Sequence, residues 1–414
     1  MLILSKDNIT EYLKTWIPEL DISGPMLISE IGEGTEEEDG DGFLNYVFRV
    51  SDGKYHLVVK QGRSQGRRVD FPLSKERNRL EYESLKIRKA IVPEYVPDIY
   101  FYDDENRVFA MEDVSYLKIA RFQLNRSVMF PKLAAQAAEY LAKTHFYTSE
   151  YYLDTKLYRE LTTHFMNHEM RSIFDDMGFI SRQADEDSEG DLDPQYASLI
   201  EDIVFDPAVI RERLSLRERY IKQGETFIHG DFHTSNIFVN EDEMKVIDME
   251  YTFCGPIGYD AGYLANNFLS QYICAFFRPF NKEEEREEFQ KYCLDSIRIL
   301  FDEYFHQFFL CWRENAKPIY RKMEEYPQFL KEEWLKDMIG FCANANLSRC
   351  SGAIGFPEYD AIYEPLERKH AVCMSLIIDK ILLLNCRKYV NIQECIRDVQ
   401  ENAKAYMEKI SIMK

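Results

Sequence analysis

The chain has 414 residues, 45% of them hydrophobic, so it is long enough to form two units that each bury a core. Its 51 basic and 72 acidic residues give a formal net charge of −21, which argues against nucleic-acid or anionic-membrane partners because these need clustered lysines and arginines. No apolar run approaches the ~18 residues of a membrane span, and the first residues carry early charges and too short an apolar run for a signal peptide. The nine scattered cysteines, with no CxxC pair, are typical of reduced thiols, so we expect a cytoplasmic globular protein.

The first quarter of the chain predicts a small antiparallel sheet with one helix. Apolar and polar residues alternate here and glycines interrupt the pattern, which is typical of strands. The expected strands are 27–32, 43–50 and 56–60, followed by two more on either side of a turn at 103–106. Residues 75–90 have the charged, amphipathic pattern of a helix.

Beyond residue 114 the hydrophobic pattern is mainly helical. The expected helices span 131–147, 154–175, 208–222, 260–277, 282–316, 328–348 and part of 364–411. We therefore expect two domains, residues 1–114 and residues 115–414. Two acidic segments, 33–41 and 182–194, are expected to be solvated loops.

The segment HGDFHTSNIFVNEDEMKVIDME, residues 229–250, is the most informative stretch of the chain. Its runs IFV and MKVI are strand-like and flank the turn-rich NEDE, which predicts a hairpin. If Val239 pairs with Met244, then Asn236 lies opposite Ile247 at the open end of this hairpin. The polar residues on both sides of the hairpin are thereby brought to one edge.

These polar residues form a candidate metal site. The hairpin brings the Asn236 amide together with the carboxylates of Asp248 and Glu250, close to Asp231. Oxygen donors that converge in this way suit a hard cation such as Mg²⁺, which usually keeps waters and substrate phosphates as its other ligands. We therefore predict Asn236, Asp248 and Glu250 as metal ligands.

The spacing within this segment is that of a kinase catalytic loop. His229-x-Asp231 is followed by Asn236 as in H-x-D-x-x-x-x-N, in which the Asp accepts a proton from the attacking hydroxyl and the Asn binds metal. The D-M-E triplet at 248–250 stands where a kinase carries D-F-G. HGDxHxxN followed by DxE resembles the small-molecule kinases related to aminoglycoside phosphotransferases and choline kinases. This resemblance implies an α+β, bilobal, protein-kinase-like fold with a small antiparallel-sheet N-lobe that carries one helix and a large, mostly helical C-lobe.

The first domain carries the features of a nucleotide site. Gly40 and Gly42 lie between strand-like runs, where backbone N–H groups can approach a phosphate, and Asn45 follows them. Lys60 ends a strand where a kinase places the lysine that contacts the α- and β-phosphates. Together these residues predict ATP as the cofactor.

Lys60 needs a carboxylate to fix its position, and the helix at 75–90 offers one. Glu81 and Glu83 are two residues apart and face different sides of this helix, so only one of them can point inward. Glu81 lies on the apolar side and is the predicted partner, with Glu83 and Glu76 as alternatives.

The run FAMEDV resembles a strand that leads into an interlobe hinge. The resemblance places the adenine hydrogen bonds on the backbone of Glu112 and Val114. The predicted ATP-binding residues are therefore Gly40, Gly42, Asn45, Lys60, Glu81, Glu112, Asp113, Val114, Asp248, Met249 and Glu250.

Longer motifs narrow the resemblance to the methylthioribose kinase family. They are GDGFLN before VFRV, VVKQ, RLEYESLKI, VPEYVPDIYFYD, IHGDFHTSNI and KVIDMEYTFCGPIGYD. The resemblance implies an ATP- and Mg²⁺-dependent kinase that phosphorylates the 1-hydroxyl of S-methyl-5-thioribose in methionine salvage, and it suggests a homodimer. It also implies that Asp260 holds the catalytic-loop backbone and that His229 and His233 brace this loop.

The chain departs from the family pattern near the expected substrate. The family carries an Arg-Arg pair there; Ser348 replaces the first arginine, Arg349 keeps the second, and Gly355 replaces a histidine. Losing one guanidinium removes a bidentate donor for phosphate or substrate hydroxyls. The predicted substrate-binding residues are Asp231, which is also the catalytic residue, and Arg349.

Two other interpretations stay open. The first is a kinase of the same superfamily with another acceptor, such as an aminoglycoside, choline or a different sugar. An acidic pocket would favour a cationic acceptor, whereas Arg349 favours a neutral polyol or thio-sugar. The second is an ATP-binding pseudokinase scaffold, against which stands the joint presence of Lys60, Asp231, Asn236 and Asp248.

Overall fold

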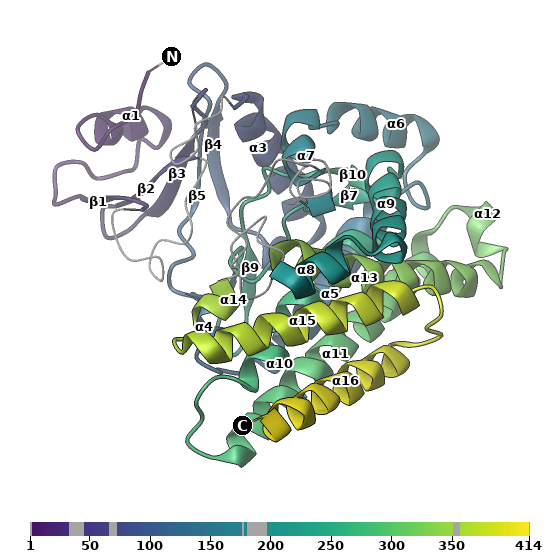
Figure 1. The fold of residues 1–414 in the computed structure, drawn as a ribbon. Coiled ribbons are helices and arrows are strands. Elements are labelled where there is room, and N and C mark those ends of the chain that lie inside the picture. Colours follow the sequence, from purple (N-terminus) through teal and green to yellow (C-terminus); the bar gives the residue numbers. More distant parts are fainter. Residues whose placement is uncertain are drawn as a thin grey trace. The chain divides into compact units, whose positions relative to one another are not determined.

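The computed structural model describes residues 2–32, 45–65, 73–175, 178–179, 197–350 and 357–413 and divides the chain into two compact units (Figure 1). Unit 1 consists of Met1–Phe122, Asn167–Met170 and Thr234–Thr252, and unit 2 of Gln123–Met166, Arg171–His233 and Phe253–Lys414. Each unit therefore gathers segments that are distant in sequence. The domain division expected near residue 114 stays a prediction.

Unit 1 contains a five-stranded antiparallel sheet with the strand order β1-β2-β3-β5-β4. Lys60 on β3 lies opposite Val47 of β2 and Phe109 of β5, so it belongs to the middle strand. Apolar residues of β2 and β3 pack against α1, a helix that the sequence analysis did not predict. The elements are α1 (Ile9–Trp16), β1 (Leu27–Glu30), β2 (Tyr46–Ser51), β3 (His56–Gln61), α3 (Glu76–Ile91), the 3₁₀ turn η1 (Pro93–Tyr95), β4 (Ile99–Asp103) and β5 (Val108–Glu112).

The predicted hairpin of residues 237–247 is confirmed, including its register. β8 (Ile237–Val239) pairs with β9 (Met244–Val246) so that Val239 faces Met244. The Ile247 N–H donates to the Asn236 carbonyl at 3.0 Å, as the sequence predicted. The short strand β6 (Lys118–Ile119) adds to β8 and completes a three-stranded sheet.

The helix expected over 154–175 is wrong as a single element. It is two helices, α6 (Thr155–His164) and α7 (His168–Asp175). Asn167 lies between them with a left-handed φ of 42°, a conformation that Asn tolerates better than most residues. The Asn167 side chain donates to the carbonyls of Glu250 and Thr252 at 2.8 and 3.0 Å, and these bonds stabilise the break.

Unit 2 is built mainly from helices, and the remaining expected helices are present. They are α5 (Leu133–Tyr147), α9 (Pro207–Lys222), α10 (Gly258–Ala275), α11 (Glu283–Asn315), α13 (Tyr326–Cys350), α15 (Pro365–Asn385) and α16 (Ile392–Met413). The shorter helices are α4 (Ala120–Asn125), which begins in unit 1, α8 (Ala197–Val204), α12 (Pro318–Arg321) and α14 (Pro357–Asp360). One antiparallel pair, β7 (Thr226–Ile228) with β10 (Phe253–Gly255), accompanies them. The expected fold class, α+β with a small antiparallel sheet and a large helical part, is confirmed.

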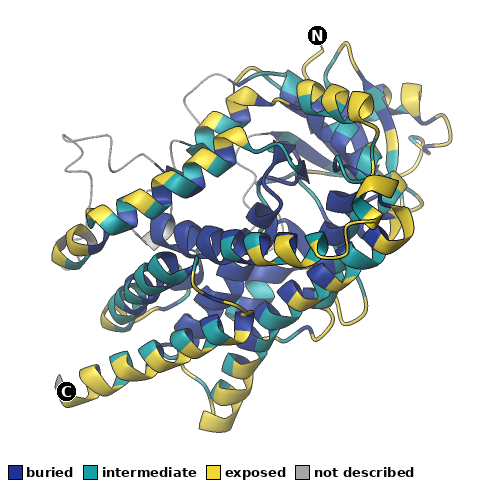
Figure 2. Ribbon diagram, turned by 90° about the vertical axis from the view of Figure 1, so that its right-hand side faces the viewer, coloured by how far each residue is buried: buried dark blue, intermediate teal, exposed yellow. Residues whose placement is uncertain are grey.

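The centre of unit 2 is α10, of which every residue is buried. It packs closely on α13: a Cβ at Gly262 would lie 2.5 Å from the carbonyl oxygen of Met338. The outer helix α16, which ends near C in Figure 2, is exposed along much of its length. Because every residue of α10 is buried, this helix holds any functional residue that it carries in a fixed position.

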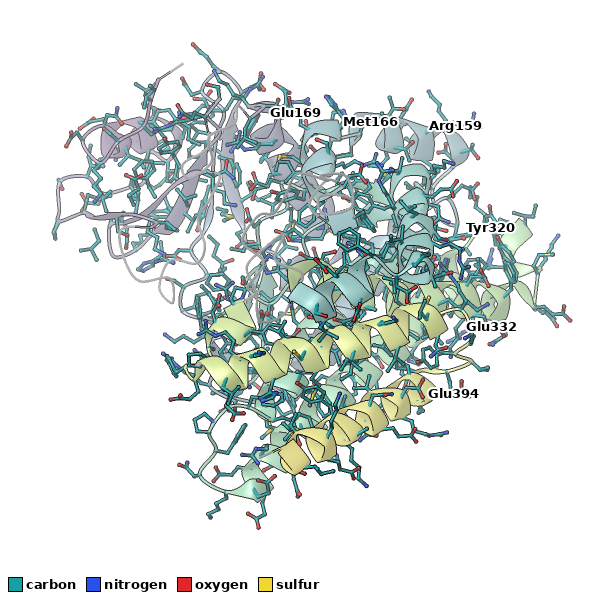
Figure 3. All side chains as sticks on the ribbon, in the orientation of Figure 1. Arg159, Met166, Glu169, Tyr320, Glu332 and Glu394 are labelled. Atoms are coloured by element: carbon teal, nitrogen blue, oxygen red, sulfur yellow. The ribbon has the colours of Figure 1, made fainter. Side chains whose placement is uncertain are left out.

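Charged side chains cover the outside of unit 2. Arg159, Glu332 and Glu394 are among those that project from its helices (Figure 3). Within the described residues, the structure has no helix with the length and apolar character needed to cross a membrane.

Glu225 holds the start of α10. The Ile257 N–H, at the N-cap of this helix, donates to Glu225 Oε2 at 2.9 Å. Burial raises the pKa of Glu225 to about 7. In the unfolded chain a glutamate titrates near pH 4.3, at roughly its ordinary value. The stability that its neutral form contributes is therefore fully present below the unfolded pKa and is lost as the pH rises to 7.

We expect Glu225→Gln to raise the free energy of unfolding by about 2 kcal/mol at pH 8 and by much less at pH 5, because the amide needs no proton to stay neutral. Denaturant titrations at both pH values measure this difference. Glu324→Gln, at an exposed position, is the matched control and should show no such pH dependence. An equal effect of Glu225→Gln at both pH values would contradict the assignment.

Candidate functional site

Lys60 is the centre of a buried ionic cluster in unit 1. Its Nζ lies 2.6 Å from Glu81 Oε1 and 2.7 Å from Asp248 Oδ1. The predicted pairing with Glu81 is thus confirmed, and the alternatives Glu83 and Glu76 both pair with Arg79 instead. The structure thereby brings together a lysine and an aspartate that are 188 positions apart.

The cluster keeps Lys60 charged. Burial acts to lower the pKa of Lys60, but the carboxylates of Asp248, Glu81 and Glu250 outweigh it and raise this pKa above its ordinary value. Burial also raises the pKa of Glu81. A fixed cation next to the end of the hairpin suits the binding of phosphate oxygens.

Asp248 directly follows the hairpin and has a left-handed φ of 66°. Such a conformation is uncommon for a residue other than glycine and is often found at functional sites. About a third of the Asp248 side chain is exposed, whereas Lys60 and Glu81 are almost fully buried. The carboxylate of Asp248 can therefore reach both Lys60 and a ligand.

Glu250 is buried and is bound by two residues of unit 1. Its Oε2 accepts from Asn45 Nδ2 at 2.9 Å and lies 3.3 Å from Arg77 Nε. Burial and the neighbouring Asp248 raise the pKa of Glu250 to about 8. Arg77 was not predicted from the sequence, although its spacing of four from Glu81 on one helix was a signal that both face the same side.

Of the predicted metal ligands, Asn236 and Asp248 offer the amide and carboxylate oxygens that Mg²⁺ takes. Asn236 is buried at the start of β8. Among the described parts of the chain, no group of three or more His, Cys, Asp or Glu side chains is arranged to hold a metal ion. Asp231 belongs to unit 2, so its expected approach to these ligands stays a prediction.

The predicted hinge residues are the last residue of β5, Glu112, and the two residues after it. The Glu112 N–H donates to the Asp98 carbonyl at 2.8 Å, and the Asp113 N–H donates to the His56 carbonyl at 3.0 Å. Val114 is buried. Adenine contacts at Glu112 and Val114 stay a prediction, and so does the role of Met249, a buried residue between the two acids.

Several predicted positions lie outside the described residues. They are Gly40, Gly42, Gly355, the acidic segments 33–41 and 182–194, and the side chain of Arg349. The glycine loop and the Arg349 contact are therefore predictions from the sequence alone.

Asp260 holds the H-G-D turn in unit 2. Its carboxylate accepts from the His229 N–H at 2.6 Å and from the Gly230 N–H at 3.0 Å, which is the backbone contact that the family resemblance implied. Gly230 has a φ of 85°, which a glycine adopts at low cost. Burial acts to raise the pKa of Asp260, but His145 and these N–H groups outweigh it and lower this pKa. His145, whose Nε2 lies 3.5 Å from Asp260, was missed because it is 115 positions away.

Asp231 is the last residue of this turn and is only partly exposed. His233 Nε2 lies 3.3 Å from Asp231 Oδ1, and the Asp231 N–H donates to His229 Nδ1 at 3.3 Å. Phe232, which lies between Asp231 and His233 in the sequence, is buried and stacks on Tyr140 of α5 with ring centroids 5.4 Å apart. Both histidines thus contact the loop as expected, and Asp231 has a defined orientation.

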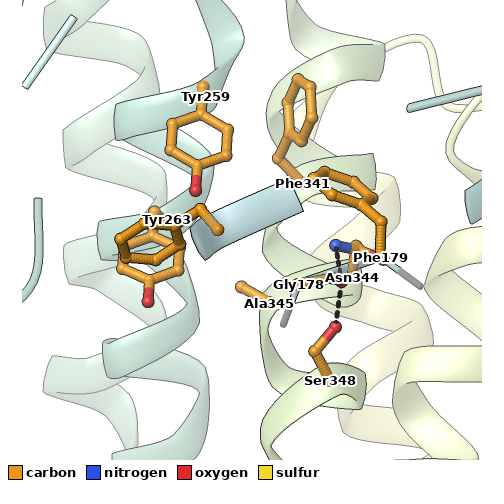
Figure 4. A pocket seen from close by; sticks show the side chains of 9 residues that line it. Gly178, Phe179, Tyr259, Tyr263, Phe341, Asn344, Ala345 and Ser348 are labelled. Carbon is orange, nitrogen blue, oxygen red and sulfur yellow. Dashed lines mark hydrogen bonds between the residues drawn. The ribbon is translucent and has the colours of Figure 1, made fainter. Parts of the chain in front are cut away.

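An aromatic pocket lies in unit 2 (Figure 4), and the ring of Tyr263 stands between this pocket and the Asp231 loop. The Tyr263 ring is 6.2 Å from the His233 ring on one side and lines the pocket on the other. The pocket is small, with about 20 Å³ available to the centre of a water-sized sphere. It is lined by Phe174, Gly178, Phe179, Tyr259, Tyr263, Phe341, Asn344, Ala345 and Ser348.

The polar groups of the pocket wall are bonded to one another. Ser348 Oγ and Asn344 Nδ2 both donate to the Gly178 carbonyl, at 2.5 and 3.2 Å. From behind, Arg213 of α9 donates to Asn344 Oδ1 at 2.9 Å and to Ser348 Oγ at 3.0 Å. Burial lowers the pKa of Arg213 to about 10. The pocket therefore offers a mainly apolar, aromatic surface.

Comparisons with known proteins agree with this chemistry. A sequence model described as "Phosphotransferase enzyme family" matches residues 35–292. The methylthioribose kinase of Geobacillus thermodenitrificans is 31% identical over 87% of this chain and 87% of its own length. That of Pectobacterium atrosepticum is 32% identical over 80% and 83%, and that of Yersinia enterocolitica 29% over 89% and 92%.

Solved structures with similar coordinates include small-molecule kinases. The choline kinase of Cryptosporidium parvum is 16% identical and aligns with a TM-score of 0.48 over 91% of this chain and 98% of its own. The ethanolamine kinase of Plasmodium vivax is 13% identical, with a TM-score of 0.47 over 92% and 90%.

We expect Lys60→Met to lower the free energy of unfolding by roughly 3 kcal/mol, because it leaves the buried Glu81 carboxylate without its cation. Thermal or denaturant unfolding measures the loss. Adding Glu81→Gln should recover part of it, since the double variant no longer buries an unpaired charge at position 81 and the remaining Asp248 carboxylate is partly exposed to water. Lys54→Met, at an exposed residue, is the control, and an equal loss in both lysine variants would contradict the prediction.

Proposed function

The chain belongs to the phosphotransferase enzyme family and is a small-molecule kinase, and we propose that it transfers the γ-phosphoryl group of ATP to the 1-hydroxyl of S-methyl-5-thioribose. The names of its relatives support this acceptor, and methionine salvage is then its pathway. The single observation that carries the proposal is the aromatic pocket beside the Asp231 loop, because an apolar methylthio group fits such a surface. We also propose a cytoplasmic homodimer, as the family resemblance suggests.

In the proposed mechanism Asp231 orients the acceptor hydroxyl and accepts its proton late in the transfer. Phosphoryl transfer involves little covalent work by the protein, so positioning and charge stabilisation supply most of the rate. The hydrogen bond that the Asp231 N–H donates to His229 and the contact of its carboxylate with His233 hold Asp231 in place, and Asp260 holds the turn beneath it.

Lys60 contacts the α- and β-phosphates in this proposal, and Glu81 keeps its ammonium directed toward them. Asp248, with Asn236 or Glu250, would hold Mg²⁺, which would supply positive charge against the phosphates. Gly40, Gly42 and Asn45 would approach the phosphates, and the backbone at 112–114 would bind adenine. Arg349 stabilises the charge that develops on the transferred group.

The chemistry of the pocket favours a neutral acceptor with an apolar end over a cationic one. The guanidinium of Arg213, which bonds Asn344 and Ser348 from behind the pocket wall, would repel an ammonium group. A thio-sugar has this character, whereas choline and aminoglycosides are cations. This supports methylthioribose over the other acceptors of the superfamily.

We expect Asp231→Asn to lower kcat for methylthioribose by roughly 10²–10⁴-fold while MgATP binding stays close to normal, because an amide cannot accept the proton. A coupled assay for ADP release measures turnover with methylthioribose, ribose, choline and an aminoglycoside. Asp242→Asn, the same change in the exposed hairpin turn, is the control and should keep full activity. Retained turnover in Asp231→Asn would overturn the assignment, and a preference for another acceptor would replace the substrate.

A second change tests the pocket itself. Ala345→Leu adds carbon atoms to the pocket wall, so we expect kcat/KM for methylthioribose to fall by roughly tenfold, whereas kcat/KM for ribose, which lacks the methylthio group, changes little. The two acceptors are compared in the same variant, so a general loss of folding affects both equally. An equal loss for both sugars would place the methylthio group elsewhere.

A further inference from the structure

Asn167 contacts the segment that carries the two predicted metal-binding acids. It lies between α6 and α7 and belongs to unit 1, together with the β8–β9 hairpin and the residues that follow this hairpin. Its Nδ2 donates to the carbonyl of Glu250 at 2.8 Å and to the carbonyl of Thr252 at 3.0 Å. One amide group therefore holds two backbone carbonyls of the segment that begins with Asp248.

The residues after Asp248 form a tight turn. The Thr252 N–H donates to the Met249 carbonyl at 3.2 Å, which is the hydrogen bond of a β-turn over residues 249–252. The two carbonyls that Asn167 binds belong to the second and the last residue of this 249–252 turn. The turn is thus held by its own hydrogen bond and, independently of it, by the Asn167 amide.

The contact between Asn167 and the 249–252 turn is shielded from water. Exposed fractions are 9% for Asn167, 2% for Glu250 and 0% for Thr252. A buried carbonyl that loses a donor is destabilised more than an exposed one, because water does not replace the lost bond. The bonds from Asn167 therefore stabilise this conformation of the turn over others in which the two carbonyls point elsewhere.

Asp248, which directly precedes the turn, requires such a support. Its left-handed φ of 66° persists only where the surrounding structure enforces it. Before Asp248, the Ile247 N–H bond to the Asn236 carbonyl fixes the chain; after it, the bonds from Asn167 do so. The strained residue is thereby held from both sides.

Asn167 is itself fixed in place. Its backbone has a left-handed φ of 42° where the chain breaks between α6 and α7. Near the start of α7, Glu169 Oε2 accepts from the Ser74 N–H at 2.9 Å, just ahead of α3. The break between the two helices is therefore attached both to the 249–252 turn and to the segment that leads into α3, which makes Asn167 a fixed donor.

We propose that Asn167 is a positioning residue of the kinase, which clamps the 249–252 turn and so keeps the carboxylates of Asp248 and Glu250 directed toward the metal ion. Asn167 itself touches neither the metal nor ATP in this role. Groups that orient metal ligands without touching the metal contribute roughly 10–100-fold to metal affinity. The inference rests on the proposed function only in that these acids bind the Mg²⁺ that accompanies ATP.

The test compares Asn167→Gly with Asn167→Ala. Both changes remove the amide, but glycine adopts the left-handed backbone at low cost, whereas alanine is strained there. Calorimetry measures ATP affinity with saturating Mg²⁺ and with a chelator. We expect both variants to reduce the gain in ATP affinity that Mg²⁺ provides by roughly tenfold, with affinity in the chelator unchanged. Thermal unfolding should begin at a lower temperature in Asn167→Ala than in Asn167→Gly.

Asn240→Gly is the matched control. Asn240 is exposed at the far end of the same hairpin, and its Oδ1 accepts from the N–H groups of Asp242 and Glu243, each at 2.8 Å. This variant also loses two bonds between a side chain and the backbone, but far along the chain from the 249–252 turn. Mg²⁺ should therefore raise its ATP affinity as much as in the wild type, and a loss equal to that of Asn167→Gly would contradict the proposal.

A purely structural role of Asn167 predicts a different pattern. The loss of the Mg²⁺ effect would then follow stability and be larger in Asn167→Ala than in Asn167→Gly. That result, an unchanged Mg²⁺ effect in Asn167→Gly, or unfolding of both variants would overturn the proposal. These measurements need no acceptor, so a failure to phosphorylate methylthioribose would overturn only the proposed substrate. A wild-type protein whose ATP affinity does not depend on Mg²⁺ would overturn both proposals.

Discussion

The burial of unlike charges in one small volume is the constraint on which unit 1 depends. In one group of charges, the cation Lys60 lies between the carboxylates of Asp248 and Glu81. The other group is the ion pair of Glu250 and Arg77. Removing one charge from such a cluster leaves an uncompensated ion that costs several kcal/mol. The middle strand of the sheet, α3 and the end of the hairpin are therefore held in a single arrangement.

Charge within this cluster is not balanced, since three carboxylates face two cations. Burial first, and then the repulsion between neighbouring carboxylates, raises the pKa of Glu81 and raises that of Glu250 to about 8. A bound cation near the exposed oxygen of Asp248 would relieve the same repulsion. The cluster thus favours a divalent ion at its open end, beside the partly exposed Asp248.

Local and regular features of the chain could be predicted from the sequence. The hairpin register followed from its strand-like runs, and the Lys60–Glu81 pair followed from helix facing. Both depend on periodicity within one or two elements. The spacing of the catalytic motif from His229 to Asn236 was also predictable, because the whole motif lies within one short segment of the sequence.

Contacts between distant, ordinary-looking residues could not be predicted in this way. In the sequence, Arg77 is one of many charged residues on a polar helix, so its bond to Glu250 could not be recognised. His145 lies in α5 with no motif around it, so its contact with Asp260 could not be recognised either. Asn167 breaks an otherwise helical pattern because its side chain bonds to carbonyls more than 80 positions away. Each of these roles exists only once the tertiary fold brings its partners near.

The departure at Ser348 shows how such distant contacts change the interpretation of a sequence pattern. Considered alone, a serine in place of arginine removes a positive charge from the expected substrate region. In the fold, the guanidinium of Arg213 lies 3.0 Å from Ser348 Oγ, on the neighbouring helix α9. An arginine at position 348 would compete with Arg213 for this buried space and repel it. Arg213 and Ser348 are therefore a matched pair, in which the positive charge stands behind the pocket wall and the wall itself remains apolar.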